Sequence, residues 1–340
     1  MTLSPATSMR EGAASRARRL IFKTTQGGLL SLLLALMLTF TLLVGAQFLA
    51  LDNLQSMAFQ LPELGILSLA MMISLLHGGV NLSLISTANL SSLTIAYVLT
   101  TMVPGSGGVA WGIWQVVAIC SGLVVAALVG LINGAVIAYL RVSPILATLG
   151  TMIMVKGIAI GLTHGTVISD FPAPIVFIGS GTVFGIPFGI ILFGGCAALF
   201  SIMLNRTPFG AAIYLMGSNE QATAFSGVDT KRVILKIYVI SSLLAAVAGV
   251  VMMARFNSAN ASYGESYLLA TILAAVLGGV DPYGGFGKVS GLILSLVILQ
   301  VISSAFNQLG LSQFMTLAIW GSILIAVSAV AMWRGRGVRR

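Results

Sequence analysis

The sequence predicts an all-α polytopic membrane protein, and three observations indicate that fold class. Of the 340 residues, 58% are hydrophobic and only 7% are charged, whereas a soluble domain carries roughly 25% charged residues. The mean hydropathy is +1.05. The apolar residues form continuous runs instead of the alternating segments of a membrane β-barrel. A soluble enzyme, a nucleic-acid-binding protein and a disordered chain are therefore excluded.

The apolar runs predict about ten transmembrane helices, since one crossing needs about 20 residues. They cover residues 29–50, 57–77, 84–103, 113–140, 145–163, 185–204, 233–254, 266–280, 289–307 and 312–333. The run 113–140 is long enough to tilt or to extend beyond the bilayer. The run 266–280 is short for a full crossing, which predicts a broken or partly re-entrant helix.

Lysine and arginine positions set the predicted topology. With a cytoplasmic N-terminus, ten crossings place 15 of the 17 Lys and Arg residues on the cytoplasmic side, as the positive-inside rule requires. Both termini are then cytoplasmic, with Lys156 inside a helix and Arg255 in an outer loop. The net charge of +9 is thus a topology signal, and no nucleic-acid partner is expected.

The same pattern divides the chain into a transmembrane domain and two tails. Residues 1–28 are basic and precede an apolar run that is too long for a signal peptide, so they are predicted to form a cytoplasmic tail. Residues 29–333 form the transmembrane domain, and residues 334–340 form a basic cytoplasmic tail. The outer loop at 164–184 is apolar and is predicted to lie on the membrane surface or to cap a pathway.

The inner loop at 205–232 is the only sizeable cytoplasmic segment between the predicted helices. Ser218 or Asn219 can cap a short helix over about 219–226, with Glu220 in its first turn and Gly227 at its end. Such a helix suits the docking of a partner protein, although an ordinary surface helix would have the same residues.

Catalytic motifs are missing from the sequence. It contains no Gly-x-x-x-x-Gly-Lys-Ser/Thr loop, no His-Glu-x-x-His motif and no Gly-x-Ser-x-Gly elbow. Cys120 and Cys196 lie in apolar runs, and His77 and His164 lie at predicted helix ends without an evident carboxylate partner. No catalytic residue, cofactor or metal is therefore expected in this chain, which is predicted to be a conduit and not an enzyme.

A conduit for a polar solute needs hydrogen-bonding side chains that face the interior of the bundle. The candidates are Asn81, Asn89, Asn133, Thr148 and Gln300, although polar side chains also serve as contacts between helices. Asn133 and Gln300 are the stronger candidates because a large amide is costly to bury unpaired. Lys156 is predicted to snorkel or to pair with a carbonyl group, and Glu63 is placed near an outer helix end.

Three sequence blocks resemble one family of transporters. The inner loop carries Tyr214, Gly217-Ser218-Asn219, Ala222 and Ser226-Gly227. A central block runs from Gly130 to Gly157, and a glycine-rich block runs from Ala274 to Gly291. In this order, over about residues 57–330, they resemble permeases of ribose-type ATP-binding-cassette (ABC) importers, which carry monosaccharides and related small polar molecules.

The resemblance implies a fold, a location and a set of partners. The chain would be a transmembrane permease in the bacterial inner membrane, surrounded by lipid and paired with a second permease subunit, identical or related. Two ATP-binding subunits would hold the ATP, and an extracytoplasmic solute-binding protein would deliver the solute. The implied coupling residues are Tyr214, Gly217, Ser218, Asn219, Glu220, Ala222, Ser226 and Gly227.

The sequence departs from the family pattern at two positions. Asn81 stands where the family usually has an aspartate, and Ala270 stands at another commonly acidic position. These departures suggest a divergent branch and weaken any mechanism that uses those carboxylates. The alternative function is a self-sufficient secondary transporter or channel, which the scarcity of acidic residues in the predicted helices disfavours.

Overall fold

The computed structural model describes residues 25–103, 107–312 and 314–325. Most of both predicted tails therefore lies outside the described residues. The helices are α2 Thr25–Val44, α3 Leu51–Leu76, α4 Leu84–Met102, α5 Val109–Leu140, α6 Pro144–Thr163, α7 Ala173–Ser180, α8 Phe188–Arg206, α9 Pro208–Ser218, α10 Glu220–Phe225, α11 Thr230–Phe256, α12 Tyr267–Leu277 and α13 Val289–Gln308, with a 3-10 turn η1 at Ala46–Leu49. A further apolar helix is described over Phe314–Ile325.

Each of the ten predicted crossings corresponds to a helix in the described part of the chain. Eight of these helices (α2, α3, α4, α5, α6, α8, α11 and α13) are long and apolar enough to cross a membrane. Of the other two, α12 has 11 residues, and the helix Phe314–Ile325 reaches the end of the described part, so residues 326–333 of the tenth predicted crossing lie outside the described residues. The all-α polytopic fold is thus confirmed. In the run 266–280, α12 is one continuous helix of 11 residues, so the run is short as expected, and a broken or partly re-entrant crossing stays a prediction.

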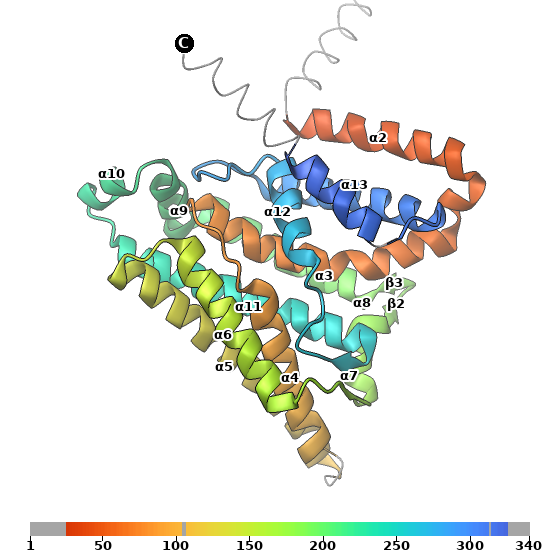
Figure 1. Ribbon diagram of the computed structural model, residues 1–340, viewed down its shortest axis with the longest axis horizontal. Helices are drawn as coiled ribbons and strands as arrows, with labels where there is room; N and C mark the ends of the chain where they lie inside the picture. The colour runs from red at the N-terminus through yellow and green to blue at the C-terminus, as the bar shows by residue number, and fades with distance from the viewer. Residues whose placement is uncertain (1–24, 104–106, 313, 326–340) are drawn as a thin grey trace, which may run out of the picture.

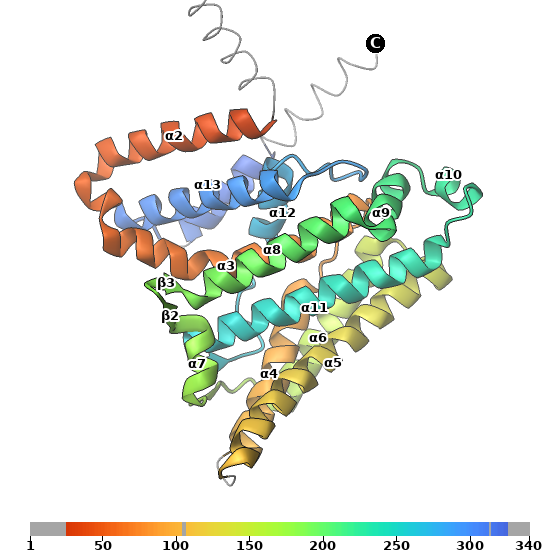
Figure 2. The same ribbon diagram turned by 180° about the vertical axis from the view of Figure 1, so that it is seen from behind.

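Helices α3 and α11 form the centre of the bundle. Helix α3 packs against α8, α11, α12 and α13, while α11 also contacts α4, α5 and α7. Helix α2 lies along α13 at the edge of the molecule (Figures 1 and 2). The edge helices α5 and α6 expose many apolar side chains, as expected for surfaces that contact lipid or another subunit.

Helices α3 and α12 end in the same local structure. Gly78, after α3, has φ +90°, and Gly279, after α12, has φ +85°. The amide of Gly79 donates to the Ser74 carbonyl, and the amide of Val280 donates to the Ala275 carbonyl, each at 3.0 Å. These are Schellman caps, in which a glycine takes the left-handed conformation that a side chain would disfavour.

The outer loop at 164–184 folds onto the end of α11. It contains β1 (Ile168–Ser169), which pairs with β4 (Ser258–Ala259), and then α7. After α7, β2 (Thr182–Val183) pairs with β3 (Ile186–Pro187). The backbone of α11 at Arg255 approaches Gly179 so closely that a side chain at Gly179 would overlap it. Helix α7 therefore covers the outer end of α11.

The structure corrects the predicted surroundings of three charged residues. Glu63 was expected near an outer helix end, but it lies midway along the 26-residue α3 and is fully buried. Arg255 was expected in an outer loop, but it lies in the last turn of α11 and forms a salt bridge with Glu63. Lys156 pairs with the carboxylate of Glu265 at 2.6 Å, and not with a carbonyl group. The hydropathy pattern could not predict these two salt bridges, because the two residues of each come from segments far apart in sequence.

Candidate functional site

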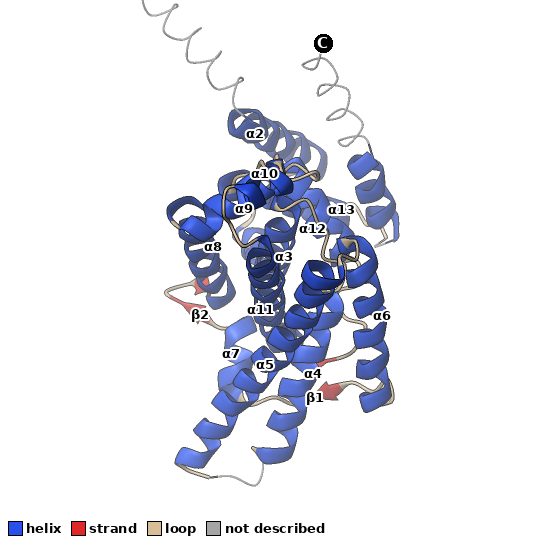
Figure 3. Cartoon of the chain, turned by 90° about the vertical axis from the view of Figure 1, so that its left-hand side faces the viewer, coloured by secondary structure: helices blue, strands red, loops and turns tan. Residues whose placement is uncertain are grey.

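The predicted docking helix is present as α10, next to α9 at the left-hand end of the molecule in Figure 1. Asn219 is its N-cap, with the side-chain oxygen accepting from the Ala222 amide at 2.9 Å. Gly227, just beyond its end, has φ +83°. The same segment begins with α9, whose first turn is capped by Thr207 and contains Pro208. The end-on view in Figure 3 shows both helices facing outward.

Helix α9 contacts the rest of the bundle through glycines, at a place we call the glycine junction (Leu76, Gly78, Gly217, Gly284 and Gly285). The amide of Gly285 donates to the Leu76 carbonyl at 2.8 Å. A Cβ atom at Gly217 would overlap both of those backbone atoms. A Cβ atom at Gly284 would lie 2.8 Å from the Gly78 nitrogen. Three backbone segments therefore meet with no space for side chains.

Tyr214 adds a hydrogen bond beside the glycine junction. Its hydroxyl donates to the Gly287 carbonyl at 2.9 Å. Burial raises the pKa of the Tyr214 hydroxyl above its usual value of about 10. The hydroxyl therefore remains a protonated donor at neutral pH and links α9 to the loop 281–288.

Exposed apolar side chains lie on α9 and the loop 281–288, which meet at the glycine junction, and on the adjoining α10. Leu215 on α9 and Phe225 on α10 are 56% and 92% exposed, and Tyr283 and Phe286 on the loop 281–288 are 77% and 68% exposed. We call these four residues the cytoplasmic patch. The sequence indicated only the inner loop 205–232 as a binding surface on this side. The structure adds a second segment, which two aromatic residues among glycines could have indicated.

Three of the predicted path residues form one buried network (Asn81, Asn133 and Thr148). Asn133 donates to the Ser83 hydroxyl at 2.9 Å, and that hydroxyl donates to the Asn81 side chain at 2.8 Å. Thr148 donates to the Val80 carbonyl at 3.0 Å. Asn133 and Thr148 hold the non-helical segment 77–83 against α5 and α6, and Asn81 ties it to α11 by donating to the Ser241 hydroxyl at 3.0 Å, so polar groups are satisfied that lipid could not satisfy. Their role in lining a path stays a prediction.

Asn89, on α4, also forms hydrogen bonds to an irregular segment of the backbone. Its amide donates to the carbonyls of Ala261 and Tyr263 at 3.0 and 2.9 Å. It thereby holds the irregular segment between α11 and α12 inside the bundle. Asn89 does not contact the network of Asn81, and whether it lines a path also stays a prediction.

Gln300 lies apart from the other candidates, in a cavity of about 340 Å³ between α3, the start of α12, α13 and the helix Phe314–Ile325. We call it the polar cavity. Gln300 donates to the Gln60 side chain at 3.3 Å. The lining residues are Asn53, Ser56, Gln60, Leu64, Ser266, Tyr267, Leu299, Gln300, Ser303, Ser304, Asn307, Gln308, Leu311, Thr316, Leu317 and Trp320. Gln300 was a predicted path residue, but the cavity itself was not predicted, because the tertiary fold brings its lining residues together.

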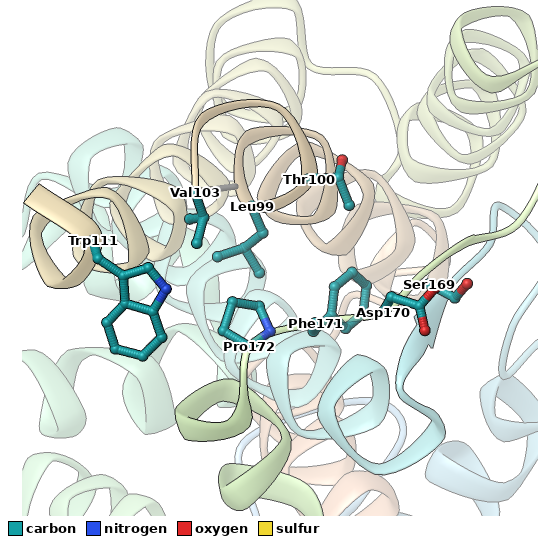
Figure 4. A pocket seen from close by; sticks show the side chains of 8 residues that line it. All are labelled: Leu99, Thr100, Val103, Trp111, Ser169, Asp170, Phe171 and Pro172. Carbon is teal, nitrogen blue, oxygen red and sulfur yellow. The ribbon is translucent and has the colours of Figure 1, made fainter. Parts of the chain in front are cut away.

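A second hollow, of about 560 Å³, opens between the outer ends of α4 and α5 and the segment 169–172. Figure 4 shows Leu99, Val103, Trp111 and Pro172 gathered there, with Asp170 to one side. Mostly apolar side chains line it, so it offers a polar solute fewer hydrogen-bonding groups than the polar cavity does.

Comparison with known proteins identifies the family. Residues 53–328 match the family model described as the permease component of branched-chain amino acid transport systems. The chain belongs to this family. It is 30% identical over 270 residues to the autoinducer 2 import system permease protein LsrD of Yersinia enterocolitica serotype O:8, covering 78% of each chain. The same identity and coverage hold for LsrD of Yersinia pseudotuberculosis strain YPIII. No solved structure matches the chain.

Family membership makes this permease the membrane-spanning subunit of an ABC importer in the bacterial inner membrane. Such a permease works with ATP-binding and solute-binding components. The ribose-type resemblance and the predicted class of transporter are therefore confirmed, and the alternative of a self-sufficient transporter is not supported.

Proposed function

We propose that the permease couples ATP hydrolysis on separate subunits to the import of a monosaccharide or a similar small polar solute. The ATP-binding subunits would dock on the cytoplasmic patch. Two permease chains would form the transporter with two ATP-binding subunits, and no nucleotide or metal would bind to the permease itself. The relatives named for autoinducer 2 import support a small solute.

The glycine junction is the observation that carries this proposal. It joins α9 to the end of α3, which is the most buried of the long helices. Close-packed backbones transmit a displacement because no flexible side chain separates them. A partner that moves α10 would therefore move α9 and α3 together, as in the rigid-body shifts of other switching proteins.

The test uses the complete transporter reconstituted in vesicles. Phe225→Asp places a charge on the most exposed apolar residue of the cytoplasmic patch, so we expect ATP-driven uptake to fall at least tenfold while membrane insertion is unchanged. Phe184→Asp, at a residue that is also fully exposed but on the outer side, is the matched control. Unchanged uptake in Phe225→Asp would contradict docking at this patch. Uptake by the permease alone, without ATP-binding subunits, would contradict ATP coupling.

A further inference from the structure

Lys156 and Glu265 form a charged pair that is partly exposed although it lies within the membrane-spanning part of the chain. Their side chains are 40% and 53% exposed, and the distance from Nζ to Oε1 is 2.6 Å. Lys156 lies seven residues before the end of α6 at Thr163, which places it about 10 Å inside the outer end of this helix. A charged pair at this depth needs a surrounding other than hydrocarbon.

Glu265 belongs to a coil that enters the bundle from the outer side. The coil, residues 260–266, follows β4 and ends where α12 begins. Near its start, the Asn260 amide donates to the Gly165 carbonyl at 3.5 Å, just beyond the outer end of α6. Glu265 meets Lys156, which lies nine positions before Gly165, so the coil descends about 13 Å along that helix. Figure 1 shows this coil running from the outer end of α11 to the start of α12.

Helix α4 holds the middle of the coil. The Asn89 amide donates to the carbonyls of Ala261 and Tyr263 at 3.0 and 2.9 Å. Asn89 lies only five residues after the start of α4 at Leu84, so these carbonyls are far inside the bundle. The coil therefore lies at membrane depth and is not a loop on the outer surface.

Lipid is excluded as the neighbour of this coil. Irregular backbone at membrane depth occurs only where protein buries it or where it lines a water-filled cavity. Ser262 and Glu265 are exposed, so the rest of this chain does not cover them. We call Lys156, Ser262 and Glu265 the polar face. A second protein chain that covered the polar face would remove the hydration of two charges, which is costly, whereas water covers it without that cost.

The polar face also has unused hydrogen-bonding capacity. An ammonium group has three donors, and Lys156 uses one of them on Oε1 of Glu265. The second carboxylate oxygen of Glu265 accepts no hydrogen bond within the described part of the chain. Because the two charges cancel, the polar face offers donors and acceptors without holding a solute too tightly to release it, as conduction requires.

We propose that the polar face lines the water-filled outer part of the solute path, and that Lys156 and Glu265 contact the solute as it passes. This inference rests on the proposed import function. It places the path between α6 and the coil before α12. The path is thus apart from the network of Asn81, Asn133 and Thr148, whose side chains are buried inside the bundle.

The first experiment measures whether water reaches Glu265 in the complete transporter, in vesicles, with Cys120 and Cys196 replaced by alanine. Two membrane-impermeant methanethiosulfonates are added on the outer side, one cationic (ethyltrimethylammonium) and one anionic (ethylsulfonate). Glu265→Cys should react at least tenfold faster than Leu34→Cys, because the reactive thiolate forms in water and not in lipid. Leu34 is the matched control, 63% exposed in the middle of the apolar α2. Equally slow reaction of both variants, without ATP and with a non-hydrolysable ATP analogue, would overturn the aqueous face.

Adding Lys156→Gln to Glu265→Cys identifies the charge beside the new thiol. Lys156 attracts the anionic reagent, so its loss should lower the ratio of the anionic to the cationic reaction rate about fivefold, as expected for one charge a few ångströms away in water. An unchanged ratio would contradict the presence of Lys156 on the polar face.

The second experiment tests whether the polar face belongs to the solute path. Labelling of Ser262→Cys with the cationic reagent should lower ATP-driven uptake of ribose or autoinducer 2 at least tenfold, because the attached group narrows the path. Phe184→Cys, at a fully exposed residue on the outer side, is the control, which should be labelled and keep its uptake. Full uptake by labelled Ser262→Cys would overturn the path role and leave the proposed function intact. If the unlabelled wild type imports neither probe, the proposed function is contradicted, while the reaction rates at Glu265→Cys still decide whether the polar face is aqueous.

Discussion

Glu63 and Arg255 form an ion pair between α3 and the outer end of α11. Glu63 is fully buried on α3, and Arg255 on α11 retains about one-fifth of its side-chain exposure. Tyr267 of α12 donates a further hydrogen bond to Glu63 at 3.2 Å. Three helices that are not consecutive in sequence are therefore held by one carboxylate. Since the desolvation cost of such a pair is large, each charge depends on its partner.

Removing one charge of this pair should destabilise the permease more than removing both. Glu63→Gln leaves Arg255 without a counterion and should lower the free energy of unfolding by about 3 kcal/mol. Glu63→Met combined with Arg255→Met should recover most of that loss. Chemical or thermal unfolding in detergent measures both effects. Equal losses in the single and the double variant would show that the charges are not coupled.

Gly217 is the residue at which the glycine junction is most sensitive. A methyl group there would overlap the Leu76 carbonyl and the Gly285 amide, so Gly217→Ala must force backbone segments apart. We expect a loss of about 1–3 kcal/mol in stability and an uncoupling of uptake from ATP hydrolysis. Gly195→Ala, in open space on α8, is the control and should change neither quantity. A Gly217→Ala variant that transports normally would contradict the role of the junction.

At the scale of elements, the end of α9, which α10 follows, lies against the loop 281–288 although more than 60 residues separate them. Ser218, at the end of α9, lies against Gly285, and the aromatic residues Tyr283 and Phe286 flank that contact. Exposed aromatic side chains near the centre of a surface are typical of protein interfaces. A partner that binds α9 and α10 should therefore also contact the loop 281–288.

Polar replacements in the loop should weaken this binding directly. Tyr283→Ser with Phe286→Ser should lower the affinity of the ATP-binding subunit at least tenfold, which corresponds to about 1.4 kcal/mol. Phe184→Ser on the outer side is the matched control. Co-purification and titration in detergent give the affinity. If the double variant binds as tightly as the wild type, the surface is restricted to α9 and α10.

Hydropathy predicted which segments are helices, and local capping residues predicted α10 with its Asn219 cap and Gly227 end. Both depend on neighbours in sequence, which is why they were predictable. The salt bridge between Glu63 and Arg255 joins residues 192 positions apart. The pairing of Gln60 with Gln300 spans 240 positions. Such contacts follow from how the helices pack, which the pattern of a single helix does not contain.

At the scale of the whole molecule, the glycine-capped ends of α3 and α12 lie at one end together with α9 and α10, and α7 and the strands β2 and β3 lie at the other (Figure 1). Lys231, Arg232 and Lys236 begin α11 at the first end. The positive-inside rule assigns that end to the cytoplasm. The proposed role of the cytoplasmic patch depends on this orientation, because ATP is cytoplasmic.

Cysteine labelling tests the orientation in a background where Cys120 and Cys196 are replaced by alanine. Gln221→Cys on α10 should react with a membrane-impermeant maleimide only when the cytoplasmic side is accessible. Phe184→Cys, between β2 and β3, should react only from the outside. Both positions are exposed, so reactivity reports sidedness and not burial. The reverse pattern would mean that the membrane orientation is opposite, with the cytoplasmic patch on the side where no ATP-binding subunit could reach it. Labelling of both positions from one side would contradict the arrangement of the helices between them.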